Sequence, residues 1–199
     1  MAQPTAVLLN RNMLTLNFTP FPTLETERLV LRKMEHKDAQ VIFQLRSDES
    51  VNLYIDHKRS ESIEGIEKFI ARINHSIERN MEMFWCLELK SEKKVIGTFC
   101  LWNIDEDHSI GEIGYQILPE YQGIGLMQEA MNVVLDYFYK TMRLRTVEAF
   151  TMPDNVNSIK LLERNNFKRN KTKEKEMGTE RIGGNSIYYL ESRSFMTRE

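Results

Sequence analysis

The stretch that decides the fold is Gly114-Tyr-Gln-Ile-Leu-Pro-Glu-Tyr-Gln-Gly-Ile-Gly-Leu-Met-Gln-Glu-Ala-Met131. Its order predicts a buried strand, a stop at Pro119, a glycine turn and then a helix. The first backbone N–H groups of a helix have no partner within it, and the helix dipole adds partial positive charge there. Glycine allows an anion to approach the main chain closely. The turn that holds Gln122, Gly123 and Gly125 therefore predicts a phosphate-binding site.

The elements around this stretch predict an α/β (α+β) fold. We expect strands over residues 28–32, 83–89, 95–102, 110–118, 146–151, 168–177 and 187–190. We expect helices over residues 36–47, 60–80, 126–143 and 158–165, with Ser60 and either Asn155 or Asn157 as caps. Short polar turns between successive strands favour antiparallel pairing, and the helix after Gly125 permits one parallel crossover.

These elements predict a single domain with a mostly antiparallel mixed sheet of about seven strands, flanked by about four helices. Proline cannot donate to a neighbouring strand, so we expect the sheet to be splayed near Pro119. The domain is expected to span residues 24–190, after a tail or pairing segment at 1–23 and before a tail at 191–199.

The composition is that of a soluble protein. The chain has 199 residues, of which 41% are hydrophobic and 28% charged, and its formal net charge is -2. This near-neutral balance gives no indication of nucleic-acid binding. No apolar run approaches the roughly 18 residues that span a membrane, and the first residues lack the order of a signal peptide. We therefore expect a cytoplasmic protein, with Cys86 and Cys100 as buried reduced thiols.

Five segments carry a family likeness. They are Leu24-Glu-Thr-Glu-Arg-Leu-Val-Leu-Arg32, Ile96-Gly-Thr98 with Leu101-Trp-Asn103, Gly111-Glu-Ile-Gly-Tyr115, Gln122-Gly-Ile-Gly-Leu-Met127, and Asn155-Val-Asn-Ser-Ile-Lys-Leu-Leu-Glu163 followed by Asn166-Phe167. The fourth segment resembles the Q/R-x-x-G-x-G/A motif of the GNAT-type N-acetyltransferases. The whole set, in this order, most resembles their RimJ/RimL-like branch, which acetylates ribosomal-protein N-termini.

The resemblance implies acetyl-CoA as the co-substrate, a primary amine as the acceptor and direct attack in a ternary complex. It also implies the residues that bind the donor. These are the main chain of Tyr115, Gln116 and Ile117 for the pantetheine arm, the turn of Gln122, Gly123, Ile124, Gly125, Leu126 and Met127 for the diphosphate, and Asn155 near the pantetheine.

Three positions depart from the family pattern. Met127 stands where the general motif has Gly or Ala, although methionine is common in this branch. Ile124 replaces a frequent Lys or Arg, which removes a charge near the phosphates. Leu162 occupies the position where many relatives have a proton-donating tyrosine, and the resemblance points to Ser158 as its substitute.

The reaction needs a base, because an amine attacks a thioester only when it is neutral. At pH 7 an α-amine of pKa about 7.8 is neutral in roughly one molecule of seven, against about one in 2500 for a lysine of pKa about 10.4. An α-amine therefore needs only a mild base. Glu112, on the strand that leads into the turn, is the first candidate, since partial burial would raise its pKa.

Glu148 is the second candidate for the base, and Ser158 is the candidate proton donor to the thiolate leaving group. Simpler roles stay open, namely an outward-facing Glu112 and a Ser158 that only caps its helix. The histidines at positions 36, 57, 75 and 108 show no metal-ligand spacing, so no metal is expected. The basic run at 168–175 is expected to be a solvated strand face, with the CoA 3′-phosphate or an acidic partner as its alternative ligand.

These residues favour an acyl-CoA-dependent N-acetyltransferase for the α-amine of a protein or peptide N-terminus. The alternatives are a small-molecule amine such as a polyamine, an amino acid or an antibiotic, and a non-catalytic acyl-CoA sensor. A dinucleotide-binding module is disfavoured, because its glycines would follow the first strand of a parallel sheet. No nucleic acid or membrane is expected as a partner, and the protein can be a monomer or a homodimer. The acceptor is expected to lie between the loops at 47–60 and 177–188.

Overall fold

The computed structural model describes residues 14–55, 62–107 and 109–192. The described strands form one eight-stranded sheet in the order β1-β2-β3-β4-β5-β6-β8-β7. The strands are β1 (Leu24–Glu25), β2 (Leu29–Lys33), β3 (Met83–Leu89), β4 (Lys94–Asp105), β5 (Ile110–Ile117), β6 (Thr146–Thr151), β7 (Lys168–Arg169) and β8 (Ser186–Glu191). The α-helices are α1 (Ala39–Ser47), α2 (Ile63–Glu78), α3 (Leu126–Asp136), α4 (Val156–Arg164) and α5 (Lys171–Met177). The predicted α/β architecture is confirmed, with one strand and one helix beyond the expected numbers.

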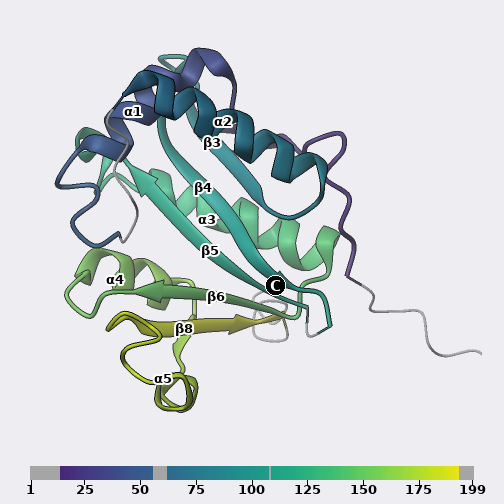
Figure 1. Ribbon diagram of the computed structural model, residues 1–199, viewed down its shortest axis with the longest axis vertical. Helices are drawn as coiled ribbons and strands as arrows, with labels where there is room; N and C mark the ends of the chain where they lie inside the picture. Colours follow the sequence, from purple (N-terminus) through teal and green to yellow (C-terminus); the bar gives the residue numbers. More distant parts are fainter. Residues whose placement is uncertain (1–13, 56–61, 108, 193–199) are drawn as a thin grey trace, which may run out of the picture.

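The sheet is antiparallel except where β5 lies parallel to β6. That crossover runs through α3 and a short π-helical segment, Tyr137–Met142, in agreement with the predicted single parallel pair. The register of β5 and β6 runs from Ile110↔Thr146 to Ile113↔Ala149 and then stops. Beyond that point the two strands spread apart, as Figure 1 shows between the labels β5 and β6.

The expected opening of the sheet near Pro119 is present, but it begins before the proline and is not caused by it. The strands part at Gly114, ahead of Pro119. β5 continues to pair with β4 as far as Gly97↔Ile117, and Pro119 lies beyond that pair at the start of a 3-10 turn. Proline therefore ends the strand but does not open the sheet. Past Ile113, β5 remains paired with β4 and β6 remains paired with β8, and the twist between neighbouring strands turns these two parts of the sheet away from each other.

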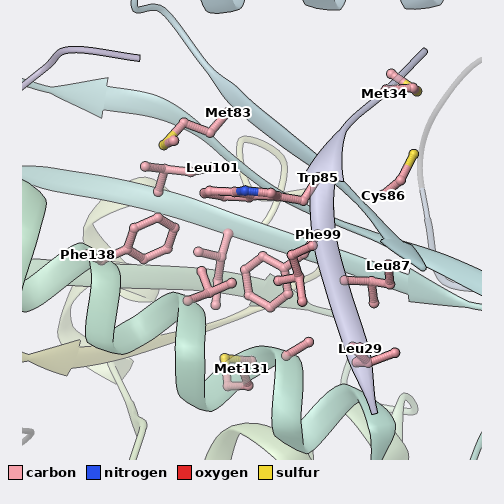
Figure 2. Packing of buried hydrophobic residues seen from close by; sticks show 14 of the residues in the cluster. Leu29, Met34, Met83, Trp85, Cys86, Leu87, Phe99, Leu101, Met131 and Phe138 are labelled. Atoms are coloured by element: carbon pink, nitrogen blue, oxygen red, sulfur yellow. The ribbon is translucent and has the colours of Figure 1, made fainter. Parts of the chain in front are cut away.

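Helices cover both faces of the sheet, with α1 and α2 in front of it and α3 behind it in Figure 1. The buried residues of α2 recur at helical spacing and face the sheet: Ile66, Ile70, Ile73 and Ile77. On the other face, Trp85, Phe99 and Leu101 point from the sheet toward the segment that carries Met131 and Phe138 (Figure 2), and all five are buried. No helix among the described residues is long and apolar enough to cross a bilayer.

Two helix starts test the capping predictions. Asn155 caps α4, where its side chain accepts a hydrogen bond from the Ser158 N–H (3.1 Å), as expected. The cap of α2 is Ser62, whose side chain accepts from the Gly65 N–H (3.1 Å). The predicted cap at Ser60 is therefore wrong in position, and Ser60 itself lies outside the described residues. Both serines precede the same row of isoleucines, so the pattern alone did not separate them.

The predicted strand over residues 168–177 is wrong. Only Lys168–Arg169 pairs with β8, and the chain then forms α5. The Asn170 side chain accepts from the Lys173 N–H (3.0 Å) and starts this helix. Residues 171–176 are lysine, threonine and glutamate without apolar alternation, so a strand there would have no face to bury, whereas a capped polar helix needs none.

Both cysteines are free thiols in adjacent strands. Cys86 is buried and Cys100 is partly buried. Burial raises the pKa of both thiols, which keeps them protonated and poorly nucleophilic.

A nearly buried ion pair holds β2 to the start of α1. Arg32 donates to both carboxylate oxygens of Asp38 (2.8 and 2.9 Å) and to Glu88 (2.7 Å). Burial raises the pKa of Asp38, but the hydrogen bonds from Arg32 and from the Glu35 N–H outweigh it, so the pKa lies below its usual range. A depressed pKa means that the carboxylate stabilises the fold at neutral pH and that this contribution is lost in acid.

We expect Asp38→Asn to lower the free energy of unfolding by about 2–3 kcal/mol. This lies near the lower end of the cost of removing one partner of a buried pair, because Glu88 still faces Arg32. Urea unfolding at pH 7 measures the loss, which should shrink as the pH falls below about 4. The control is Glu64→Gln, in the exposed pair with Lys68, where a change below about 0.5 kcal/mol is expected. Equal effects of the two variants would contradict this account of the Asp38 pair.

Candidate active site

The candidate site lies where β5 and β6 separate. Because these two strands are parallel, their carboxyl ends point the same way, and the chain enters α3 after one and α4 after the other. Ligands of open α/β sheets bind at such carboxyl edges. The two helix starts carry exposed apolar side chains, Ile124 and Val156, at 57% and 52% exposure. An apolar or mixed ligand that enters between the strands would cover them.

The turn before α3 has the geometry of an anion site. Gly123 and Gly125 have φ of 76° and 85°, a backbone conformation that favours glycine. Glu129 donates the first i to i−4 bond of the helix, to the Gly125 carbonyl (3.1 Å), so the N–H groups before it have no such partner. No heavy atom lies within 4 Å of the place where a Gly123 side chain would begin. The turn therefore offers free donors, the positive end of a helix and room for a phosphate.

Arg28 supplies the cation that Ile124 lacks. Its Nη1 donates to the Ile124 carbonyl (3.0 Å), and its Nη2 lies 3.3 Å from the place where a Gly125 side chain would begin. Its Nε donates to Glu129, which also accepts from the Thr26 hydroxyl (2.8 Å). Sequence reasoning missed this contact, because the guanidinium and the turn are 96 residues apart in the chain. The only signal was that Arg28 stands within one of the quoted family segments.

On the α4 side of the opening, two hydroxyls meet. The Tyr115 and Ser158 oxygens are 2.9 Å apart. The Tyr115 ring packs against Phe99, with their centroids 5.7 Å apart. Burial raises the pKa of Tyr115 to about 12, so its hydroxyl stays protonated and can donate to Ser158. Leu162 is fully buried and takes no part in this pair. A tyrosine hydroxyl therefore lies beside Ser158, but it comes from β5 and not from α4, and Tyr115 had been predicted only for its main chain.

A cavity of about 600 Å³ lies beside the same opening, along the β4, β5 and β6 strands and the loop after α5. Its charged lining residues are the acids Asp105, Glu112, Glu148 and Glu180 and the bases Lys173 and Arg181. Acidic groups outnumber basic ones, so the cavity favours a cation. Of the two loops predicted to surround the acceptor, the one after Met177 lines this cavity. Of the first loop, residues 47–55 do not contribute to the lining, and residues 56–60 lie outside the described part of the chain.

The two candidate bases are neighbours with different environments. Glu112 pairs with Glu148 in the parallel register, so both side chains lie on the same face. Burial raises the pKa of Glu112, a hydrogen bond from Asn103 (2.8 Å) opposes this, and the charge of Glu148 adds to it; the pKa lies above its usual range. Both carboxylate oxygens of Glu148 accept from Lys173 (2.7 and 2.6 Å). Glu112 is the carboxylate better suited to take a proton.

The alternation of β5 separates the two groups of residues. Glu112 and Tyr115 have opposite parity along the strand, so Glu112 faces the cavity while Tyr115 and Ser158 lie on the other side. Both groups lie at the edge where the strands part. Among the described residues no cluster of His, Cys, Asp and Glu has the grouping needed for a metal ion, and His57 and His108 lie outside them.

Comparison with known proteins identifies the family. Residues 28–168 match the sequence profile described as an acetyltransferase (GNAT) domain. The chain belongs to the GNAT family. The uncharacterized N-acetyltransferase p20 of Bacillus licheniformis is 36% identical over 148 residues, which cover 74% of this chain and 83% of that protein. This GNAT chain is therefore an acyl-CoA-dependent N-acetyltransferase.

Two relatives have named acceptors. The spermidine N(1)-acetyltransferase of Vibrio cholerae is 27% identical, over 70% of this chain and 79% of that protein. The ribosomal protein uS5-alanine N-acetyltransferase of Escherichia coli is 28% identical, over 75% of this chain and 80% of that protein. The solved structure of RimL, the ribosomal L7/L12 alpha-N-protein acetyltransferase, in complex with coenzyme A has a TM-score of 0.74 at 17% identity. It covers 87% of this chain and 99% of that one, and it shows the shared fold.

We expect Gly125→Asp to weaken CoA binding by about 100-fold or more. The new side chain would strain a left-handed backbone and place a negative charge beside the free N–H groups. Isothermal titration calorimetry with CoA measures the change. The control is Asn132→Asp, which adds the same charge to the exposed face of α3 while keeping the side-chain bond to Gln128. Unchanged CoA affinity in a folded Gly125→Asp protein would show that the turn before α3 does not bind the phosphates of CoA.

Proposed function

We propose that this GNAT enzyme transfers the acetyl group of acetyl-CoA to the α-amine of a protein or peptide N-terminus, in a ternary complex. The observation that carries the proposal is the half-buried carboxyl of Glu112, with its raised pKa, at the edge where an acidic cavity meets the opening between β5 and β6. A mild base of this kind suits an amine that is already partly neutral at pH 7.

The donor site fits acetyl-CoA. The N–H groups of the turn from Gly123 to Met127, together with Arg28, would hold its diphosphate, whereas the Gln122 N–H already donates to the Pro119 carbonyl (3.1 Å). The Tyr115, Gln116 and Ile117 main chain borders the opening on the side away from β4, which suits pairing with the pantetheine arm. Asn155, at the start of α4, faces the same edge of the sheet. When bound, acetyl-CoA supplies an activated acetyl group on a thiol leaving group.

The chain's own residues would then transfer two protons and stabilise one developing charge. Glu112 takes the proton of the acceptor ammonium, directly or through one water, on the cavity side. A backbone N–H at the free edge of β5 stabilises the negative charge that develops on the carbonyl oxygen. Ser158 gives its proton to the leaving sulfur, and the Tyr115 hydroxyl donates to Ser158 as it does so. The opening between the strands holds donor and acceptor together, which supplies much of the rate.

The cavity also suits the end of a polypeptide. Its lining combines carboxylates with apolar side chains from Ile110, Phe150 and Ile182, which can receive an ammonium group and the first side chains of a peptide. The uS5-alanine relative acts on such an N-terminus by its name.

A second candidate function has an observation of its own. Four carboxylates line the cavity, and a polyamine presents several ammonium groups at once. The spermidine relative makes this acceptor class the alternative to a peptide. A non-catalytic acyl-CoA sensor would require the same turn but no base, and it differs from both enzymes by the absence of turnover.

We expect Glu112→Gln and Ser158→Ala each to lower kcat by about 10- to 100-fold while CoA affinity stays within about twofold. Steady-state kinetics and calorimetry measure the two quantities. The wild-type advantage over Glu112→Gln should shrink as the pH falls through the raised pKa of Glu112, because a protonated carboxyl cannot accept a proton. Asn157→Ala, on the exposed face of α4, is the control for Ser158. Unchanged rates in both site variants would refute these two roles.

We expect peptides with a free N-terminus to give the highest kcat/KM in an acetyl-CoA consumption assay with peptides, polyamines and free amino acids. The control peptides carry a blocked N-terminus and an internal lysine, and these should react at least about tenfold more slowly because a lysine needs a stronger base. A higher kcat/KM for spermidine than for the peptides would contradict the peptide acceptor and support a polyamine acceptor. Tight CoA binding without turnover on any amine would favour the sensor.

A further inference from the structure

The cavity already contains a primary amine that belongs to the chain itself. Lys173 of α5 places its Nζ within 2.7 and 2.6 Å of the two carboxylate oxygens of Glu148. The Lys173 side chain is 33% exposed and that of Glu148 is 9% exposed, so the contact lies inside the lining and not on the outer surface. The ε-ammonium thus occupies a place that suits the ammonium of an acceptor.

The position of Lys173 is set by several contacts of its helix. The Lys173 N–H donates to the Asn170 side chain (3.0 Å), which fixes the first turn of α5. The next residue, Glu174, accepts from Arg169 (2.9 Å) and from the Ile187 N–H (2.9 Å), which ties the helix to β7 and β8. Lys171 and Lys175 stand two positions away on either side and are exposed. The helix therefore directs one of its three lysines into the cavity.

The neighbours of this amine are the groups that acetyl transfer needs. Glu148 pairs with Glu112 in the β5–β6 register, and Ile113↔Ala149 is the last pair before the strands part. The Lys173 amine therefore contacts the carboxylate beside the proposed base. Glu148 stands one position before the last paired residue of β6, next to the opening proposed to hold the thioester. Arg181, the other basic residue of the lining, is a guanidinium and not a nucleophilic amine at neutral pH.

We infer that Lys173 is an internal acceptor, which the enzyme acetylates from its own bound acetyl-CoA. The inference rests on the proposed function, since it uses the same donor site and the same base; a lysine of a free peptide lacks the fixed position beside the donor that offsets the weak base for Lys173. The Lys173 ammonium loses a proton to a cavity carboxylate, and its nitrogen then attacks the thioester carbonyl carbon. A C–N bond forms, the C–S bond breaks and the sulfur leaves as CoA thiol after taking a proton. The balance is one acetyl-CoA consumed, with one CoA, one amide and one proton released.

Acetylation would also change the acceptor cavity. The amide carries no charge, so Glu148 would lose its ionic partner and the cavity would become more acidic beside Glu112. An external cationic acceptor would then no longer compete with the Lys173 ammonium for Glu148. An enzyme that has been acetylated by acetyl-CoA would therefore bind a cationic acceptor more tightly than the unmodified enzyme.

The experiment incubates the full-length protein with acetyl-CoA and no acceptor, followed by intact-mass measurement and peptide mapping. Lys171 and Lys175 serve as internal controls, because uncatalysed acetylation favours exposed lysines. Lys173 should be modified on the order of tenfold or more faster than either control, since its amine is held beside the donor. The rate per molecule should not depend on protein concentration, and Gly125→Asp should abolish it while Asn132→Asp does not. The Lys173→Arg variant should remain unmodified at the cavity.

The outcomes separate this inference from the proposed function. Equal modification of the three lysines, or an unmodified Lys173 in a preparation that acetylates an N-terminal peptide, overturns the inference and leaves the proposed function in place. Selective acetylation of Lys173 with no activity on any peptide supports the inference and removes the proposed acceptor. Modification that is second order in protein shows transfer between molecules and also overturns an internal acceptor.

Discussion

The structure depends on one constraint, the early end of pairing between the parallel strands β5 and β6. Four register pairs hold them together, from Ile110↔Thr146 to Ile113↔Ala149. After that, β5 stays with β4 and β6 stays with β8, so each half of the sheet keeps its own partners. Between Gly114 and Ile117, the edge of β5 that faces away from β4 has no strand partner among the described residues. The carboxyl ends of both strands then lead into α3 and α4, whose starts border the same opening.

The proposed catalytic groups lie on two sides of β5. The period of a strand sends successive side chains to opposite faces, so Glu112 and the Tyr115–Ser158 pair are separated by a single strand. Amide synthesis from a thioester requires a proton to leave the nitrogen and another to reach the sulfur. With the roles proposed above, the carboxylate on one side and the hydroxyl pair on the other would keep these two transfers apart, so that the base is not neutralised by the acid.

Charge also distinguishes two glutamates that the register makes neighbours. Glu148 and Glu112 lie on adjacent strands on the same face, but Lys173 bonds to both oxygens of Glu148. Glu112 accepts a hydrogen bond from the Asn103 amide (2.8 Å), and burial raises its pKa above the usual range. The bonds from Lys173 occupy Glu148, which makes Glu112 the better candidate for a proton acceptor.

Much of the fold could be predicted because the signals are local. The glycine turn before α3, the Asn155 cap and the central strands each depend on residues within a few positions of one another. The prediction of a strand over 168–177 was wrong because the signals for this segment are not local. A polar segment has no intrinsic periodicity to read, and its helical state depends on the Asn170 cap and on the contacts of Glu174 with Arg169 and β8.

By itself, the sequence determined the class of fold, the glycine turn before α3 and the family, because glycine and proline act on the backbone where they stand and ordered segments are read along the chain. Only the tertiary structure decided which side chains meet across the site. Arg28 reaches the turn from 96 residues away, Tyr115 meets Ser158 across the opening, and Lys173 enters the cavity from α5. These contacts are set by strand register and helix placement, which arise from the packing of the whole core and not from the spacing of the residues concerned.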